Sequence, residues 1–583
     1  MKLAYPATSS VIAAPTESTI ALSLESGRGV VGFHGRVKDA ELFRDALLTT
    51  FALMQSDLRY KGKDRTAYLA YLMKQGKRAT AAIWEAQKSF LDNAYADAAP
   101  RPRGLDPIVT VDPDEVSLEV FSRDESAYAR LAFDNAMFDG RAVSHGTTLA
   151  EISPALIEQV ERIRTYQPLS FDAATTRKGG APLAREIDVA DDWLRGFLQV
   201  QSAATLPSAT AHLAPVDLYN VLFTLKTHRA KKAPRGLRFE LVPGQRPVVV
   251  VEPWEITLEA HGEPYRGTSP RIVRLFGRQR LSCLARALPH SKGVRVHLMG
   301  PGLPSFWVLD MGLARLTVAL TSWSESKWGS VTSFDALMPA SGDMDRVVGE
   351  LERRGPLSLS ELGASREDAQ RATLAGRVLF DFDRNVYRPR KLLADPVDPA
   401  RIRYGSPREA LAHRLLDGGG DIAVTKLHSI AGEGLEISGE VTDKVVRRTF
   451  APRFTVDLEG QVREAWCNCP TYQRSAMREG PCEHMLALFV FHKRSQVEAE
   501  RLRLTTEGRK LVRAETRTLV RRDRLGARDE VRLSLDDRVV RVERGGRHQR
   551  MWFDTDVEAR EAYFARLDDL ADKGFIDTDA MSA

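Results

Sequence analysis

Three of the four cysteines in the chain lie within sixteen residues, at Cys467, Cys469 and Cys482, and His484 lies two positions after the last of them. Thiolates and an imidazole are ligands that tetrahedral zinc prefers, and soft sulfur favours zinc over magnesium or calcium. Four protein ligands leave no position for a water molecule. The pattern therefore predicts a structural Zn²⁺ rather than a catalytic one. The alternatives are a Cys469–Cys482 disulfide and inert core thiols.

The neighbouring sequence predicts the elements that would hold these ligands. Two alternating runs, 448–457 and 461–466, are joined by Leu-Glu-Gly and predict a hairpin. Cys467 and Cys469 come at the end of its second strand, where side chains two apart point to the same face. The apolar run after Pro481 predicts a helix whose positive N-terminal end stabilises a thiolate at Cys482.

Hairpin, Cys-x-Cys, a twelve-residue spacer, Cys-x-His and helix together resemble the SWIM-type zinc finger over residues 446–495, with all four ligand positions present. That resemblance implies a domain that binds DNA or proteins. The phrases GLEISGEV (434–441) and GPCEHMLAL (480–488) are similar to those of full-length bacterial SWIM zinc finger family proteins of similar size. Such proteins are associated with multi-component systems that contain ATPases.

A chain of 583 residues, with 43% hydrophobic and 28% charged residues, predicts several globular domains. We expect an α+β, multidomain protein. Its predicted parts are a mixed α+β N-terminal region (1–180), a β-rich domain (181–340), a winged-helix-like domain (341–395), a SWIM-type zinc finger domain (420–500) and a WGR-like domain (510–583). The sequence has no apolar run of membrane-spanning length and no signal-peptide core, so we expect a cytoplasmic protein that does not bind membranes.

Periodicity places several elements in the first 340 residues. A helix is expected to begin after Asp39 as N-cap, and a second helical pattern runs over 64–96. A further helix is expected with Pro215 in its first turn. Between 185 and 335, short β-branched and aromatic runs bounded by Gly and Pro predict strands at 238–242, 246–254, 294–300, 305–311 and 315–323.

Residues 343–392 predict three helices followed by a hairpin around Asp383–Asn385, with Ser365 as an N-cap. This order is that of a winged helix, a domain that often places a helix in a DNA groove. Many such domains mediate only protein contacts.

The C-terminal stretch 516–577 predicts three or four strands followed by a helix that begins at Thr555. This order resembles the WGR domain. Arg544 falls at the position of the family's arginine, whereas Val542 and Glu543 stand where the family has Trp and Gly. The departure weakens any transfer of the nucleic-acid contact that the family makes through its Trp.

The formal charge of +6 is small, but basic residues are concentrated after the predicted finger, where 493–550 holds 18 Lys and Arg against 10 Asp and Glu. Such a tract suits polyanion binding, or is a set of solvated helix and strand faces. The candidate nucleic-acid-binding residues are Arg474, Arg478, Lys493, Arg494, Arg521, Arg522, Arg544 and Arg547.

No catalytic motif for phosphate transfer, zinc proteolysis or acyl transfer is present in the sequence. Cys283 lies in an apolar run and is expected in a core. We therefore predict a non-catalytic, zinc-binding protein that binds nucleic acid, and infer no small-molecule substrate. The first alternative is a protein-interaction scaffold in a multi-component, ATPase-associated bacterial system. An unrecognised enzyme is a lesser one.

Overall fold

The computed structural model describes two compact units, Met1–Leu198 with Arg390–Pro396, and Gln199–Pro389 with Val397–Ala583. The described residues are 1–57, 104–176, 182–230, 235–300, 303–321, 337, 342–398, 400–430, 434–457, 462–477, 480–503, 505–510, 512, 514–522, 527–536 and 538–577. The helical pattern at 64–96 and the predicted domain boundaries at 180 and 340 lie outside them.

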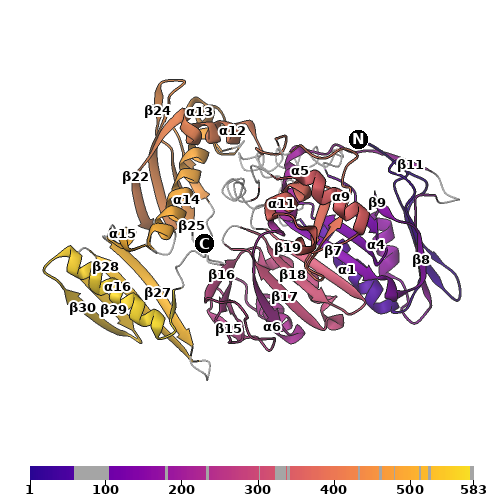
Figure 1. The fold of residues 1–583 in the computed structure, drawn as a ribbon, viewed down its shortest axis with the longest axis horizontal. Coiled ribbons are helices and arrows are strands. Elements are labelled where there is room, and N and C mark those ends of the chain that lie inside the picture. Colours follow the sequence, from indigo (N-terminus) through magenta and orange to yellow (C-terminus); the bar gives the residue numbers. More distant parts are fainter. Residues whose placement is uncertain are drawn as a thin grey trace, which may run out of the picture. The chain divides into compact units, whose positions relative to one another are not determined.

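Unit 1 contains sheets that pack on a long helix (Figure 1). Its strands are β1 (Lys2–Tyr5), β2 (Ser10–Ala13), β3 (Ser18–Ser23), β4 (Gly32–Val37), β5 (Ile108–Val111), β6 (Glu115–Phe121), β7 (Ala127–Asp134), β8 (Phe138–Ser144), β9 (Gly146–Leu149), β10 (Leu169–Ala174) and β11 (Leu183–Glu186). One sheet has the order β2-β3-β10-β4-β8, in which only β3 and β10 run parallel. Strands β9, β5, β6 and β7 are antiparallel neighbours, and β1 pairs with β11.

The helices of unit 1 are α1 (Ala40–Gln55), η1 (Asn135–Met137), α4 (Pro154–Glu161) and α5 (Asp191–Ala203), which continues into unit 2. The predicted N-cap is confirmed, because the Asp39 side chain accepts a hydrogen bond from Leu42 N. Buried Phe43 on α1 lies 4.4 Å from the Phe133 ring and 5.3 Å from the Phe171 ring, measured between centroids. The core of this unit is therefore a helix-on-sheet layer.

Unit 2 begins with two antiparallel sheets. Strands β12 (Ala209–Leu213), β17 (Gly293–Leu298), β18 (Ser305–Asp310) and β19 (Ala314–Leu320) follow one another in the first. The second has the order β15 (Ile256–Glu259), β14 (Val248–Val251), β13 (Leu237–Leu241) and β16 (Arg271–Leu275). These strands overlap the five predicted ones. They are accompanied by α6 (Pro215–Thr227), with Pro215 in its first turn as predicted, η2 (Arg278–Ala285) and η3 (Leu288–His290).

The three helices and hairpin predicted over 343–392 are present. They are α9 (Met344–Arg354), α10 (Leu359–Leu362), α11 (Arg366–Leu374), β20 (Val378–Asp381) and β21 (Val386–Pro389). Ser365 caps α11 in a reciprocal capping box with Asp368. These elements have a core of their own around Val347, Leu351 and Tyr387. Assignment to the winged-helix class remains a prediction.

One cavity in unit 2, about 380 Å³ in volume, is lined by His297 of β17 together with Phe382 and Tyr387. The Nδ1 atom of His297 lies 3.2 Å from Thr210 Oγ1, and its ring lies 4.6 Å from that of Phe382. Burial, and then the positive charge of Arg295, lower the pKa of His297 from 6.5 to about 4. The folded protein therefore holds this imidazole neutral at neutral pH.

We expect His297 to make folding stability pH-dependent. As the pH falls below about 6.5, the unfolded chain binds a proton that the folded chain refuses until about pH 4, so stability is lost across this window. The contribution is roughly 2 kcal/mol at pH 5 relative to pH 7.5. Urea unfolding at both pH values should show a smaller loss for His297→Gln than for the wild type. Equal losses in the two proteins would contradict the assignment.

The last two parts of unit 2 are separate sheet-and-helix layers. The first contains α12 (Pro407–Arg414), a π-helical turn (Leu415–Gly419), β22 (Gly420–Ile430), β23 (Gly434–Asp443), β24 (Arg448–Phe450), β25 (Arg453–Asp457), β26 (Val462–Trp466), α13 (Pro470–Ser475) and α14 (Glu483–Arg503). The second contains α15 (Thr506–Arg509), β27 (Ala514–Arg522), β28 (Arg528–Asp536), β29 (Val539–Arg544), β30 (Arg547–Trp552), α16 (Asp556–Asp572) and β31 (Ile576–Asp577). Their hydrophobic cores are distinct.

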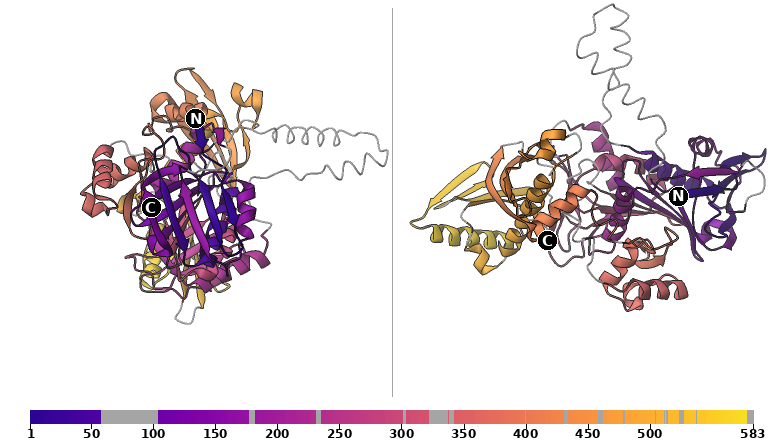
Figure 2. Two further views of the ribbon diagram at one scale, coloured as in Figure 1. Left: turned by 90° about the vertical axis from the view of Figure 1, so that its right-hand side faces the viewer. Right: turned by 90° about the horizontal axis from the view of Figure 1, so that it is seen from above.

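The C-terminal layer has the predicted order of four strands and a helix. Thr555 caps α16 in a capping box with Glu558. The helix lies along one face of the β27–β30 sheet (Figures 1 and 2), where its Tyr563 and Leu567 pack with Leu533 and Val540 of the strands. No helix in the described part of the chain is long and apolar enough to cross a membrane.

Candidate metal centre and candidate nucleic-acid face

The predicted hairpin positions the first predicted ligand, Cys467. Strands β25 and β26 pair antiparallel from Arg453 opposite Trp466, and Cys467 follows directly after the second strand. The long hairpin of β22 and β23 extends this sheet, because β23 also pairs with β25. The glycine-rich stretch 416–421 forms a turn that leads directly into β22.

The second ligand is held differently from the prediction. Cys469 is not a strand residue but the N-cap of α13, and its Sγ accepts a hydrogen bond from Tyr472 N at 3.3 Å. Pro470 at the first helical position favours this start, since its ring fixes φ and it has no N–H to satisfy. The turn brings the Cys469 sulfur to Cys467 without the strand geometry that the spacing suggested.

The last two ligands come from the N-terminus of α14, as predicted. Cys482 directly precedes the helix, and His484 lies in its first turn. The helix packs on β22 and β23 (Figure 1), and the Phe489 ring lies 5.7 Å from that of Phe454 on β25. A Cβ added at Gly439 would lie 2.5 Å from Leu488 Cδ1 and 2.6 Å from the Ala423 carbonyl oxygen, so only glycine allows this close approach.

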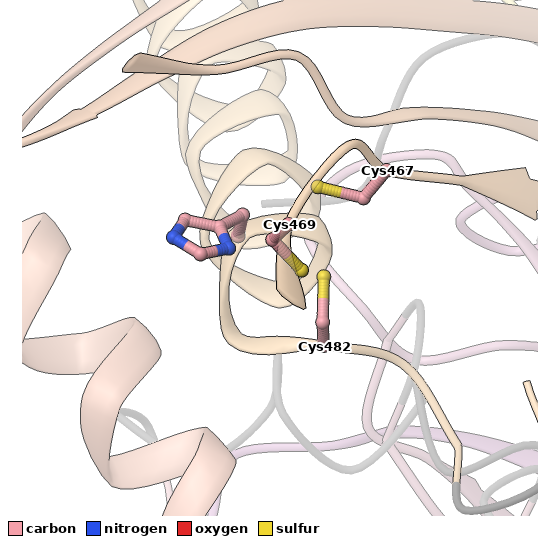
Figure 3. A group of neighbouring side chains, drawn as sticks. Cys467, Cys469 and Cys482 are labelled. Atoms are coloured by element: carbon pink, nitrogen blue, oxygen red, sulfur yellow. The ribbon is translucent and has the colours of Figure 1, made fainter. Parts of the chain in front are cut away.

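The four predicted ligands meet at one point. One ligand atom from each of Cys467, Cys469, Cys482 and His484 lies within 4.8 Å of all the others, and all four residues are buried. Figure 3 shows the three labelled sulfurs turned toward one another. Ligands at about 2.0–2.3 Å from a shared zinc ion lie less than about 4 Å apart, so a small contraction of the cluster would enclose the ion.

The chemistry of the cluster fits Zn²⁺. All three cysteines are unpaired by disulfides, which sets aside a Cys469–Cys482 bond. The Nδ1 atom of His484 is buried and has no hydrogen-bond partner among the described residues, as expected of a metal ligand. Hydrogen bonds with Cys467 and Cys469, together with burial, raise the pKa of the Cys482 thiol. A bound cation would offset that crowding of thiolates.

Groups around the cluster fix its geometry. Phe450 of β24 packs on the His484 ring with centroids 4.0 Å apart. Thr471 Oγ1 donates to the Glu483 carboxylate at 3.2 Å, which ties α13 to the start of α14. The Asn468 side chain accepts from Ala451 N at 2.9 Å and so anchors the loop between the first two ligands. The four side chains are thus held by three elements of one core.

The candidate nucleic-acid residues of the finger differ in their surroundings. Arg474 is exposed on α13. Lys493 is half-buried over the Phe489 ring, and burial lowers its pKa. Arg494 is exposed on α14. Arg478 lies outside the described residues.

Three of the C-terminal candidates are engaged by carboxylates. Arg544 makes two hydrogen bonds to Asp529, at 2.9 and 2.5 Å, and Arg521 contacts the same aspartate at 3.3 Å. Arg522 donates to Glu240 at 2.9 Å. Arg547 is exposed on β30, opposite Arg544 in the register. These contacts neutralise part of the basic tract.

The face of the C-terminal sheet opposite α16 carries a second set of groups that the sequence did not single out. In the register of β28, β29 and β30, Ser534 lies beside Arg541 and Arg541 beside Arg550. Arg532, His548 and Trp552 occupy the same face and are exposed, with Trp552 at 75%. Arg532 and Arg550 form no ion pair within the described part of the chain. The alternation of 548, 550 and 552 along one strand is the sequence signal that could have identified this shared face.

Comparisons with known proteins place one part of the chain. Residues 454–493 match the family model of the SWIM zinc finger. No curated protein matches the chain. Among solved structures, the chain is similar to Proliferating Cellular Nuclear Antigen from Entamoeba histolytica, with 11% sequence identity over 50% of this chain and 98% of that one, at a TM-score of 0.30. Similarity at that level carries no argument about function.

Proposed function

We propose that this protein is a non-catalytic nucleic-acid-binding factor, in which the SWIM zinc finger is an architectural element and the C-terminal sheet provides the binding face. The four-ligand cluster is buried and supports a structural role, because a catalytic zinc keeps one position open to water or substrate. Burial raises the pKa of Cys283 to about 12, so this thiol stays protonated at neutral pH and makes a poor nucleophile.

The observation that carries the proposal is the open face of β28, β29 and β30. Arg541 and Arg550 pair across β29 and β30, and Arg550 lies two residues from Trp552 on the same face, where the Trp552 indole is 75% exposed. Neighbouring strands lie about 4.8 Å apart, so the directly paired Arg541 and Arg550 bring two cations together next to the indole. Exposed aromatic rings beside arginines suit single-stranded nucleic acid, since unpaired bases stack on the ring while phosphates meet the cations.

Three carboxylates limit the charge of this face without cancelling it, and one of them, Glu530, pairs with Arg528 at 3.0 Å. Asp536 pairs with Arg541 at 3.1 Å, and Glu543 lies 3.2 Å from His548. Arg532 and Arg550 remain to contact phosphates, so the proposed site binds a strand through few ionic contacts. Its affinity should therefore fall only moderately with salt.

Replacement of Trp552 by alanine is expected to weaken binding of a fluorescein-labelled 20-mer of thymidine by roughly fivefold or more, because a stacked base contributes about 1–3 kcal/mol. Arg550→Ala should weaken binding and also lower the salt slope, by about 0.7 for each lost phosphate contact. Fluorescence anisotropy from 50 to 200 mM salt measures both effects.

Tyr166→Ala is the matched control, since Tyr166 is 77% exposed and lies in unit 1. It should leave binding unchanged. Failure of the wild-type protein to bind the strand at 50 mM salt, or equal binding by wild type and Trp552→Ala, would refute the proposal. A duplex bound more tightly than the single strand would contradict stacking as its basis.

A further inference from the structure

A wide groove in unit 2 lies between α6 and the η2–η3 segment, far along the chain from the finger and the C-terminal sheet. Its volume is about 990 Å³. One wall is formed by α6 side chains including Val216, Tyr219 and Phe223, and the other by Ser282, Leu288 and further residues of η2 and η3. Most of this lining is apolar.

The α6 wall presents an apolar stripe to solvent. Val216, Tyr219 and Phe223 follow one another at three and four residues, which places them on one side of the helix. They are 50%, 58% and 55% exposed, and the two aromatic rings stack at 6.4 Å. Large apolar side chains exposed together in this way mark an interaction surface rather than scattered surface residues.

The charged residues that line the groove are all basic. Its lining includes the basic residues Lys226, His228, Arg229, Arg235 and Arg278, and no Asp or Glu. Arg278 has a structural role, since it donates hydrogen bonds to the backbone carbonyls of Gly236 and Glu252 and lies over the Trp254 ring. Lys226 and Arg229, by contrast, are exposed, and neither forms an ion pair with any described residue.

We propose that this groove binds an acidic, amphipathic helical segment of a partner protein. The apolar face of such a helix would cover Val216, Tyr219 and Phe223, and its carboxylates would meet Lys226 and Arg229. A helix in an apolar groove is a common mode of peptide recognition, and complementary charge at the rim selects its partner. This binding function goes beyond nucleic-acid binding and uses a different surface.

A small molecule fits the groove less well. Pockets for small ligands enclose most of the ligand surface. Here the aromatic side chains that would hold the ligand are themselves more than half exposed. A rod-like peptide of several turns covers such an open wall, whereas a compact molecule leaves much of it in water.

The test uses the full-length protein and a fluorescein-labelled 18-residue peptide with Leu at helical spacing and Glu elsewhere. A scrambled peptide of the same composition lacks the apolar stripe. We expect anisotropy to show binding of the patterned peptide and at least tenfold weaker binding of the scrambled one. Tyr219→Ala/Phe223→Ala should weaken binding of the patterned peptide about tenfold or more, the scale seen when central interface anchors are truncated.

Charge reversal provides the second arm. Lys226→Glu/Arg229→Glu should weaken binding of the acidic peptide. The same variant should strengthen binding of a peptide in which Lys replaces each Glu. Arg353→Glu, at an exposed position on α9, is the control and should leave the binding of both peptides unchanged. All these residues are exposed, so folding should be retained, which thermal melting checks.

Three outcomes would overturn the proposal. The first is no binding of the patterned peptide at about 1 mM, beyond which affinity is negligible. The second is equal binding of the patterned and scrambled peptides. The third is displacement of the peptide by a 20-mer of thymidine together with loss of oligonucleotide binding in the Tyr219→Ala/Phe223→Ala variant, which would make the groove a nucleic-acid site. Loss of oligonucleotide binding in Trp552→Ala tests only the proposed site on the C-terminal sheet, so its outcome is separate from that of the groove.

Discussion

Replacement of Cys482 by serine is expected to abolish stoichiometric zinc binding and to loosen the finger. Cys482 is buried in the same core as Phe454, Met485 and Leu488, so a metal bound there would join α14 to the sheet from inside. Structural zinc contributes on the order of 10–16 kcal/mol in isolated fingers, so an equal share for one of four ligands is roughly 2.5–4 kcal/mol. Metal analysis of the purified protein should fall from about one zinc ion per chain to far less.

Hydrogen exchange locates the effect. Amides of β25, β26 and the first turns of α14 should lose protection in Cys482→Ser, whereas those of the β27–β30 sheet should keep theirs, because the two layers have separate cores. Cys283→Ser is the matched control, since Cys283 lies outside the cluster, and it should keep its zinc. Unchanged zinc content and melting in Cys482→Ser would show that the ligand assignment is wrong.

Replacement of Arg388 by methionine is expected to destabilise unit 2 by about 3–5 kcal/mol, because it removes a buried guanidinium that pairs with a buried carboxylate. Arg388 and Asp381 are 1% and 2% exposed, and Arg388 Nε donates to Asp381 Oδ2 at 2.9 Å. The other oxygen of Asp381 accepts from the backbone N–H groups of Asp383 and Arg384. The carboxylate thus organises the β20–β21 turn and forms a buried ion pair with Arg388.

Urea unfolding measures this change. Arg353→Met is the matched control, since Arg353 pairs with Glu350 at the surface with 68% exposure, and its loss should change stability by less than about 0.5 kcal/mol. The double variant Asp381→Leu/Arg388→Met should recover part of the lost stability, because no charge is then buried alone. Equal midpoints for Arg388→Met and Arg353→Met would refute the role given to the pair.

The candidate metal centre was predictable because its signal is local and chemical. Cys467, Cys469, Cys482 and His484 are few, close in sequence and of the types that zinc prefers. The caps at Asp39, Ser365 and Thr555 were predictable for the same reason, since each depends on hydrogen bonds to a residue three positions away. The place of Cys469 on a helix rather than a strand was missed, because the choice depends on a six-residue helix with little sequence signal.

The binding surfaces were less predictable. Sequence reasoning gave weight to Arg521, Arg522 and Arg544 for their basic charge, but their carboxylate partners lie between 8 and 282 positions away in the chain. Trp552 and Arg550 become candidate binding residues only through the register of β30 with β29, which puts them on the face that α16 does not cover. The groove beside α6 likewise depends on where η2 and η3 pack.

The sequence by itself thus predicted the four residues of the candidate metal centre and the starts of several helices, because ligand chemistry and helix capping act between near neighbours in the chain. The tertiary structure alone decided which arginines are paired with carboxylates, which aromatic residues remain in water and where an apolar groove opens. Those properties depend on contacts between residues distant in sequence, and burial and charge pairing are set only when the layers have packed.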